Sequence, residues 1–399
     1  MKRTFSICTL AISLTLVWSS GDAQVYKKLN FDFYGIPIQL ECDTSLNTPF
    51  DESLSGESVQ NFAFRLMSSE HTSLSASLEK YRNDHKLDDW LFYQLIRATA
   101  QQLSPKEANY NRYTLIKWHL LTITGYDARL KLANDQLLFY VQCSEAIYNI
   151  PYYEKNDRQY VCLNYHDFKE VDFRKYNFTE VPMPVYGEKN FSYKISSLPQ
   201  FTPSDYDERT VHFDYYQKNY RFSFKLNPSI RKIFKNYPAV DYASYFNIPL
   251  SHQTYQSLIP VLKENTSGMD IKEGVDYLMR FTRYAFLFQT DTRIFGAEKR
   301  LTPEQTLLSE YSDCEDRSAL FFYLVKEIYN LPMLVIAYPN HVTVAVKFDK
   351  PAGKPIVYNG SAYSICEPTP QKKDLRLGEL PKSVRNQPYE IAYVYTPSN

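Results

Sequence analysis

The sequence predicts an α+β protein with more than one domain. Helical spacing of apolar residues is clearest over residues 62–102, where Trp90, Leu91 and Leu95 recur on one face. Strand-like runs follow at 128–132, 137–143 and 160–163. A mature chain of roughly 375 residues also exceeds what one hydrophobic core usually serves.

The first 23 residues are expected to be a secretory signal peptide. Lys2 and Arg3 precede an apolar run from Phe5 to Trp18, and small residues follow near Ala23. The run is about 14 residues, too short to span a bilayer, and no later stretch of about 20 apolar residues occurs. We therefore expect an exported protein, periplasmic, secreted or on the cell surface, without a transmembrane segment.

Charge and cysteine content narrow the function further. Lys+Arg and Asp+Glu balance at 45 each, which argues against nucleic acid or an anionic membrane as the main partner. Five cysteines remain after the signal peptide, and an odd number in an oxidising compartment leaves at least one thiol unpaired or bonded to another chain. The five are Cys42, Cys143, Cys162, Cys314 and Cys366.

The remaining elements follow in order. A second helix is expected at 113–124, ending at Gly125. Residues 169–227 are rich in Tyr, Phe and Pro, and 211–226 alternates like a hairpin, which predicts a β-rich middle domain. Helices return after Pro228 and continue through 275–288, and a loop then leads to Cys314.

An internal repeat underlies this order. An offset of 205 residues lays 125-GYDARLKLANDQLLFYVQ-142 over 330-NLPMLVIAYPNHVTVAVK-347 and, without a gap, 109-NYNRYTLIKW-118 over 314-CEDRSALFFY-323. Arg112 then matches Arg317, whereas Cys314 meets Asn109 and His341 meets Gln136. Chance similarity between two helix-then-strand segments is the alternative explanation.

Cys314 stands at the start of a predicted helix. Ser312 or Asp313 can cap this helix, and its apolar positions recur every fourth residue from Leu320. The positive end of the helix dipole is expected to lower the thiol pKa from about 8.5. The neighbouring acids Asp313, Glu315 and Asp316 oppose this effect by like charge.

A cysteine nucleophile needs a base, and the base needs an orienting group. His341 is the one histidine in the last 147 residues, and it opens the strand-like run 341-HVTVAVKF-348. Alternation places His341 opposite the face shared by its valines. Glu367, in 363-YSICEPT-369, is the candidate orienting acid, and alternation sends Cys366 to the other face.

The segments SDCEDRSALF, PNHVTVAV and YSICEPT together resemble the transglutaminase-like superfamily of papain-like fold, and DCED is similar to bacterial transglutaminase-like cysteine peptidases of the periplasm. The resemblance covers about residues 270–380 and, weakly, 85–168. It implies a nucleophile at Cys314, a general base and acid at His341 and an orienting residue at Glu367. Glu departs from the Asp that the family usually carries there.

The residue patterns, together with the resemblance for the first and last regions, predict three domains after the signal peptide. These are a degenerate transglutaminase-like domain at 24–168, the β-rich middle domain at 169–227 and a catalytic transglutaminase-like domain at 228–399. The expected activity is a cysteine peptidase or amidase that forms a thioacyl-enzyme with a polypeptide, a peptidoglycan peptide or another amide. The backbone N–H of Cys314 and an upstream donor, with Tyr311 as candidate, would stabilise the oxyanion.

Several alternatives stay open at this point. The chain could be a binding or scaffold protein that keeps the fold, or a transamidating crosslinking enzyme. Trp90 and Trp118, the mature chain's only tryptophans, lie in the early copy, which favours hydrolysis because eukaryotic transglutaminases line their acyl site with tryptophan. Disulfides could join Cys143 to Cys162 or Cys314 to Cys366. No cofactor or metal is expected: a structural zinc site normally has four ligands, and a requirement for calcium is left open.

Overall fold

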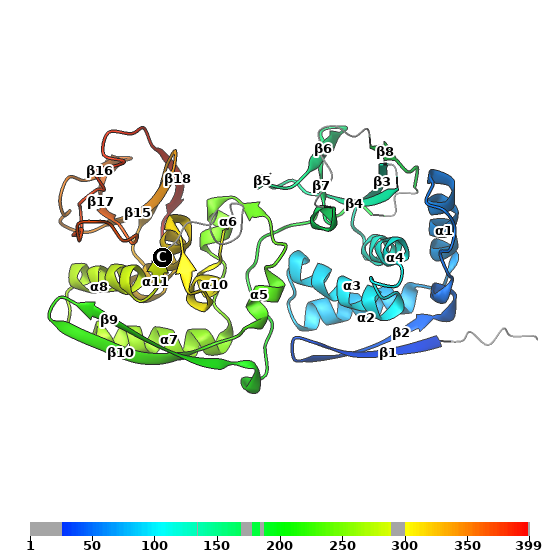
Figure 1. The fold of residues 1–399 in the computed structure, drawn as a ribbon, viewed down its shortest axis with the longest axis horizontal. Helices are drawn as coiled ribbons and strands as arrows, with labels where there is room; N and C mark the ends of the chain where they lie inside the picture. Colours follow the sequence, from blue (N-terminus) through cyan, green and yellow to red (C-terminus); the bar gives the residue numbers. More distant parts are fainter. Residues whose placement is uncertain (1–25, 134, 169–177, 184–186, 289–299, 398–399) are drawn as a thin grey trace, which may run out of the picture.

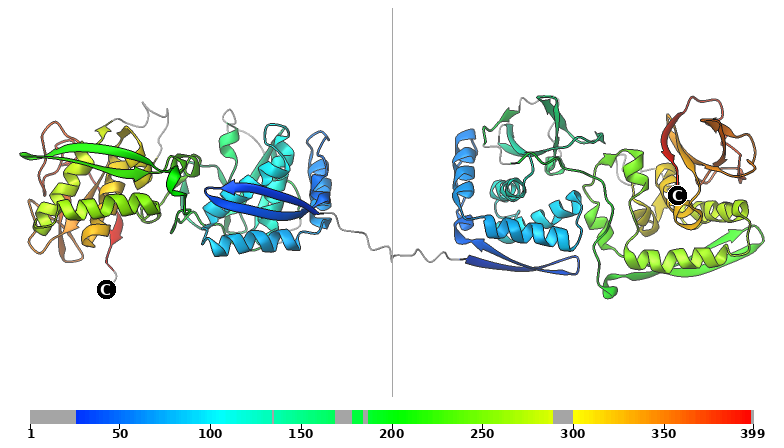
Figure 2. Two further views of the ribbon diagram at one scale, coloured as in Figure 1. Left: turned by 90° about the horizontal axis from the view of Figure 1, so that it is seen from below. Right: turned by 180° about the vertical axis from the view of Figure 1, so that it is seen from behind.

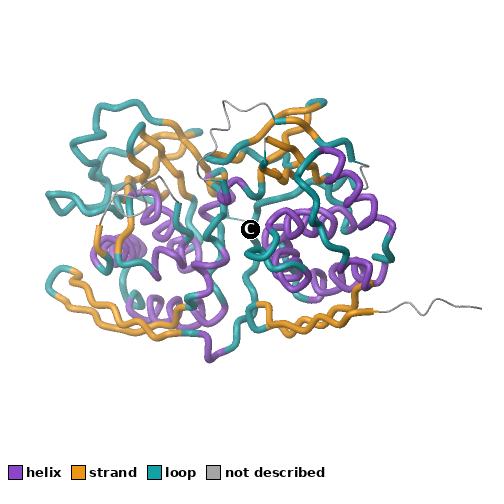
Figure 3. Tube along the Cα trace, turned by 45° about the vertical axis from the view of Figure 1, so that its right-hand side comes forward, coloured by secondary structure: helices purple, strands orange, loops and turns teal. Residues whose placement is uncertain are grey.

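A computed structural model describes residues 26–133, 135–168, 178–183, 187–288 and 300–397. The predicted signal peptide lies outside these residues. The chain folds into two lobes that lie side by side, residues 26–200 in one and the later residues in the other (Figure 1). Each lobe carries helices between a two-stranded hairpin on one side and a five-stranded antiparallel sheet on the other (Figure 3). The mixed α+β class predicted from the sequence is confirmed.

The N-terminal lobe begins with the hairpin and ends with the sheet. Its hairpin strands are β1 (Tyr26–Phe33) and β2 (Ile36–Asp43), and its helices are α1 (Gly56–Ser68), α2 (Thr72–Asp84), α3 (Asp89–Leu103) and α4 (Tyr110–Ile123). The sheet has the order β6-β7-β4-β3-β8. Its strands are β3 (Ala128–Ala133), β4 (Gln136–Gln142), β6 (Tyr152–Lys155), β7 (Arg158–Cys162) and β8 (Thr179–Glu180).

The C-terminal lobe repeats this plan. Its hairpin strands are β9 (Asp207–Tyr215) and β10 (Lys218–Leu226), and its helices are α5 (Ser229–Ile233), α6 (Tyr242–Phe246), α7 (His252–Asn265), α8 (Ile271–Tyr284), α10 (Pro303–Leu308) and α11 (Cys314–Tyr329). The sheet has the order β16-β17-β15-β14-β18. Its strands are β14 (Met333–Tyr338), β15 (His341–Lys347), β16 (Ile356–Tyr358), β17 (Ser361–Cys366) and β18 (Glu390–Tyr395).

The internal repeat is therefore confirmed in three dimensions. The bounds of β3 and β4 fall on those of β14 and β15 at the predicted offset of 205 residues, and the two sheets have matching strand orders. Gly125 and Asn330, which the overlay superimposes, both have positive φ angles, of 93° and 49°. Glycine and asparagine tolerate this left-handed conformation best, so both helices end in the same way.

The described residues of 169–227 do not form a separate β-rich domain. Residues 169–177 and 184–186 lie outside the described part, but β8 pairs with β3 in the N-terminal lobe. The predicted hairpin exists as β9–β10, and it packs against α7 and α8 of the C-terminal lobe. Its apolar side chains complete a neighbouring core, as the edge-to-face contact of Phe213 with Tyr277 shows (ring centroids 5.2 Å apart). Figure 2 shows both hairpins along the same side of the molecule.

The lobes meet at short contacts. β5 (Ile147–Tyr148) of the N-terminal lobe pairs with β11 (Ala239–Val240) of the C-terminal lobe. Inside the C-terminal lobe, β12 (Leu287–Phe288) pairs with β13 (Tyr311–Ser312). Three 3-10 turns complete the described elements. Across the junction, Trp90 Nε1 donates to the carbonyl oxygen of Ile233 at 3.0 Å. The Trp90 ring also contacts Tyr193 and Tyr237.

The C-terminal sheet has two apolar faces, and each face belongs to a different hydrophobic cluster. Val335 and Val344 lie opposite each other and belong to the main core, on the side of α11. Leu334 and Ala345, the next pair, belong to a second cluster on the outer face. Opposite residues of an antiparallel pair share a face and successive residues alternate. Within the described residues, no helix is both long and apolar enough to cross a membrane.

Candidate active site

The first turn of α11 carries Cys314. Asp313 caps the helix: its side chain accepts from the backbone N–H of Asp316, and the Asp316 side chain accepts in return from the N–H of Asp313. This reciprocal capping box, with Asp313 rather than Ser312 as the cap, fixes the helix start. Cys314 is the first helical residue, so its backbone N–H lacks a partner within the helix.

A buried arginine holds this helix start in place. Arg317 Nη1 donates to the carbonyl oxygens of Thr282 and Arg283 at 2.8 and 2.9 Å, and Nη2 donates to that of Phe286 at 3.0 Å. Thr282 and Arg283 belong to the last turn of α8, where backbone acceptors have no helical partner, and Phe286 lies two residues beyond the helix. Arg112 does the same in the N-terminal lobe, donating to the carbonyl of Leu103 at the end of α3.

His341 and Glu367 form a close pair. His341 Nε2 lies 2.7 Å from Glu367 Oε2, and the Glu367 side chain is fully buried. The other Glu367 oxygen accepts from the backbone N–H of Thr369 at 2.9 Å. Arg283 donates through Nε to the Glu367 backbone oxygen at 3.2 Å. The carboxylate therefore fixes the imidazole orientation and leaves Nδ1 as the ring nitrogen available to another group.

The thiol lies beside the strand that His341 opens. The backbone N–H of Val342, the residue after His341, donates to the Cys314 sulfur, and the Glu367 carboxylate is near enough to act on the thiol by charge. Ser318, one turn further along α11, donates through Oγ to the Val342 carbonyl oxygen at 2.9 Å. The three residues predicted to act together, Cys314, His341 and Glu367, thus converge where α11 begins and β15 and β17 meet.

The expected low pKa of the thiol is not found. Burial, and next the Asp313 carboxylate, raise the pKa of Cys314 well above its usual range, and the Val342 N–H opposes them only in part. Desolvation of the charged form outweighs the favourable helix start. The resting thiol is therefore protonated at neutral pH, so a nucleophilic role would require His341 to remove the proton during attack.

The other acids of the segment have partners of their own. Glu315 pairs with Arg300, with Oε2 2.7 Å from Nε, and accepts from the Tyr242 hydroxyl. Asp316 accepts from the backbone N–H of Leu301 at 2.8 Å. Among the carboxylates of the described residues, Asp313 raises the pKa of the thiol most, followed by Glu315 and Glu367.

The matching positions in the N-terminal lobe carry amides. Asn109 caps α4 and accepts from the N–H of Arg112 at 2.9 Å, and Gln136 opens β4. Asn164 follows β7 as Glu367 follows β17, and it accepts from the N–H of Phe139 at 2.8 Å. The sequence overlay did not match Asn164 with Glu367. The chain between β15 and β17 is two residues shorter than the chain between β4 and β7, which breaks the constant offset of 205 residues.

Tyr311 lies in β13, three residues before Cys314, and is 37% exposed. No hydrogen bond is found for its hydroxyl among the described residues. Its role at the oxyanion stays a prediction. Tyr338 is a neighbour that the sequence did not single out: it is the β14 partner of His341, and their ring centroids are 6.4 Å apart.

The five cysteines that the structure describes form no disulfide. Cys42, Cys143, Cys162, Cys314 and Cys366 are all free. The pairing of Cys143 with Cys162 and that of Cys314 with Cys366 are therefore not present. Cys366 belongs to the main core, on the face of Val344, with which it pairs.

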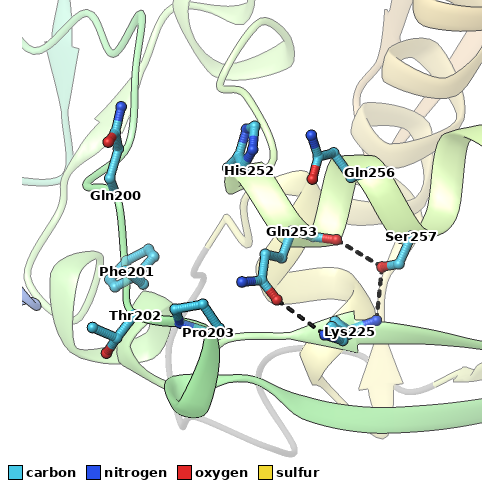
Figure 4. A pocket seen from close by; sticks show the side chains of 9 residues that line it. All are labelled: Gln200, Phe201, Thr202, Pro203, Lys225, His252, Gln253, Gln256 and Ser257. Carbon is cyan, nitrogen blue, oxygen red and sulfur yellow. Dashed lines mark hydrogen bonds between the residues drawn. The ribbon is translucent and has the colours of Figure 1, made fainter.

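One cavity of the molecule lies apart from the three converging residues. Figure 4 shows a cavity of about 690 Å³ lined by Gln200, Phe201 and residues of β10 and α7, which include none of the three converging residues. In the part of the chain that the structure describes, no group of three or more His, Cys, Asp or Glu side chains is arranged to hold a metal. Comparisons with protein-family models, curated proteins and solved structures returned no match to this chain.

Proposed function

We propose that the protein is a thiol-dependent acyl-transfer enzyme, a transglutaminase-like cysteine peptidase or amidase, with Cys314, His341 and Glu367 as its catalytic residues. The observation that carries the proposal is the buried Glu367 carboxylate 2.7 Å from the His341 imidazole, beside the strand whose N–H contacts the Cys314 sulfur. A histidine that is oriented by a buried carboxylate and adjoins a thiol is the arrangement that nucleophilic catalysis needs.

The reaction would proceed in two steps. As the Cys314 sulfur bonds to the amide carbonyl carbon, the thiol proton passes to His341, and the imidazolium is stabilised by Glu367. The C–N bond then breaks, the imidazolium gives its proton to the leaving amine, and a thioester remains. Water, deprotonated by His341, attacks the thioester, and the carboxylic acid leaves as the proton returns to sulfur. The backbone N–H of Cys314, which has no partner within its own helix, is suited to the oxyanion.

Hydrolysis is favoured over transamidation. Trp118 is buried in the core of the N-terminal lobe, and Trp90 is buried at the junction between the lobes, where it contacts Ile233 and Tyr237 rather than the three catalytic residues. A tryptophan-lined acyl site that would exclude water is therefore not available from either residue. The N-terminal lobe, with amides at the matching positions, is proposed to be a non-catalytic copy of the same domain.

Acylation by a generic activated ester tests the proposal. The mature protein is mixed with p-nitrophenyl acetate at pH 7.5, release of p-nitrophenol is followed by absorbance, and the acetyl group is located by mass spectrometry. We expect a burst with the label on Cys314. Cys314→Ala should abolish it, and His341→Gln should slow it by about 100-fold, because the protonated thiol then lacks its base.

Gln136→Ala is the matched control, because Gln136 opens β4 as His341 opens β15. This variant should leave the burst unchanged. Equal acylation of wild type and His341→Gln, or a label on another cysteine, would contradict the enzyme and favour the scaffold protein. All three variants, Cys314→Ala, His341→Gln and Gln136→Ala, should first be shown to keep the wild-type circular dichroism spectrum.

A further inference from the structure

A second cavity lies on the face of the sheet that presents His341. It has a volume of about 620 Å³ and is bounded by the sheet, by residues 354–357 and by residues 378–389. Tyr338 and Ile365 form part of its lining. Both belong to the outer-face cluster, and Tyr338 lies directly opposite His341 in the register of β14 and β15.

The cavity adjoins the catalytic residues along two strands. On β14 and β15, the ring centroid of its wall residue Tyr338 is 6.4 Å from that of His341. On β17, its wall residue Ile365 is two positions before Glu367, so their side chains share a face. An extended peptide advances about 3.4 Å per residue, so two residues span such a separation. A substrate whose scissile amide lies at the His341 imidazole can therefore reach the cavity with its next two or three residues.

The charges of the cavity favour an anion. Lys354 and Arg385 line it, and neither has an ion pair or hydrogen bond within the described residues. The one acid of the lining, Glu379, already accepts from Lys373 Nζ and from the backbone N–H of Arg376, both at 3.0 Å. Two cations beside an apolar wall of Tyr338 and Ile365 suit a carboxylate carried by a short peptide.

The position beside the imidazole decides which part of the substrate enters. His341 gives its proton to the leaving amine, so the leaving part of the substrate lies on the imidazole side of the scissile bond. We infer that this cavity binds the leaving portion of the substrate, a short peptide segment that carries a carboxylate two or three residues beyond the bond that is cleaved. The inference rests on the proposed function and adds a substrate class to it.

A binding measurement tests the cavity without catalysis. Three peptides with an N-terminal fluorophore are titrated with the Cys314→Ala protein and followed by anisotropy: Gly-Gly-Ala with a free carboxylate, its C-terminal amide, and Gly-Gly-Glu amide. We expect either carboxylate peptide, or both, to bind about fivefold more tightly than the Gly-Gly-Ala amide, as two partly exposed charge contacts allow. Preference for Gly-Gly-Ala acid indicates a terminal carboxylate, and preference for Gly-Gly-Glu amide indicates an acidic side chain.

Matched charge removals identify the site. The Lys354→Gln, Arg385→Gln double variant should bind all three peptides equally. A Lys350→Gln, Lys382→Gln double variant, which removes two exposed lysines from the same region that do not line the cavity, should keep the fivefold preference. Equal affinities in the parent protein, or a preference that survives loss of Lys354 and Arg385, would overturn the inference.

A second measurement joins the cavity to the reaction. An amine that accepts the acyl group occupies the place of the leaving amine, because the two steps are the reverse of each other. The acetyl-enzyme from p-nitrophenyl acetate is therefore offered the same peptides with free N-termini, and acetyl-peptide is measured by mass spectrometry. We expect about a fivefold preference for a carboxylate peptide, lost on removal of Lys354 and Arg385. Absence of any acetyl-enzyme would refute the proposed function alone, since the anisotropy result stands independently.

Discussion

At the scale of single residues, the protein buries ionisable groups and controls their protonation by what surrounds them. Burial raises the pKa of the Cys314 thiol, so its reactivity would depend on His341 rather than on a preformed thiolate. Lys117 on α4 shows the opposite consequence. Its ammonium lies over the Tyr113 ring at 4.5 Å, and burial, followed by Arg97, lowers its pKa from 10.5 to about 7.

Lys117 makes stability depend on pH in a defined window. Between about pH 7 and 10.5 the unfolded chain binds a proton that folded Lys117 lacks, so this residue makes stability rise with pH and its full destabilisation applies below pH 7. Lys117→Met keeps the volume and removes the ionisable group. We expect the variant to be more stable at pH 7 by about 1–3 kcal/mol, with the difference shrinking toward pH 10.

Urea unfolding of both proteins at pH 6, 7, 8.5 and 10 measures this difference. The other groups that act on Lys117 are Asp167, Lys106 and Cys162, and they are present in both proteins. A difference in unfolding free energy that is constant across the four pH values would show that Lys117 does not carry the effect.

At the scale of elements, one arginine in each lobe joins the start of the helix under the sheet to the end of an earlier helix of the same lobe. Arg317 does so for α11 and α8, and Arg112 does so for α4 and α3. Arg112 also donates to the carbonyls of Thr48 and Leu46, at 2.8 and 2.7 Å. Since each guanidinium satisfies several buried carbonyls, it positions whole elements rather than a single side chain.

Loss of either arginine should therefore destabilise the protein. Arg317→Met and Arg112→Met leave at least three carbonyl acceptors without donors, and we expect each to lower the unfolding free energy by about 3 kcal/mol. Arg231→Met is the control, because Arg231 is exposed and donates only to the Leu308 carbonyl among the described residues. Guanidinium unfolding checks the order; a control variant as destabilised as the other two would contradict it.

At the scale of the whole molecule, the sequence predicted the repeat because helix and strand periodicities survive where identities do not. Cys314, His341 and Glu367 were predicted to act together, and alternation along the strands predicted the face on which each strand residue lies. The prediction of a separate middle domain was wrong. The sequence pattern of an aromatic hairpin is the same whether the hairpin has its own core or completes a core on α7 and α8. The cavity wall from 354–357 and 378–389 could not be predicted, since loops with no periodicity carry no information on what they enclose.

The junction between the lobes centres on one side chain. Trp90 fills the space between Tyr193 and Tyr237 and bonds the Ile233 carbonyl. Trp90→Ala should lower stability by about 3 kcal/mol through the cavity and the lost hydrogen bond. Trp118, the other tryptophan of the described residues, then reports on the N-terminal lobe alone.

Thermal unfolding followed by Trp118 fluorescence and by calorimetry should separate the lobes in this variant. We expect the fluorescence transition to coincide with only part of the heat absorption, because the junction no longer couples the lobes. Coincident transitions in the variant would show that other contacts, such as the pairing of β5 with β11, suffice for coupling.

The arginine in each lobe that joins two helices, Arg317 or Arg112, has a consequence for how such a protein can change in evolution. Both lobes share three features: this arginine, the helix end at Gly125 or Asn330, and the strand order. The chemical groups at the helix start and at the strand ends differ between the lobes. Architecture and reactivity are thus heritable apart from one another. A duplicated lobe can lose or exchange its reactive groups by a few point mutations while its folding instructions stay untouched.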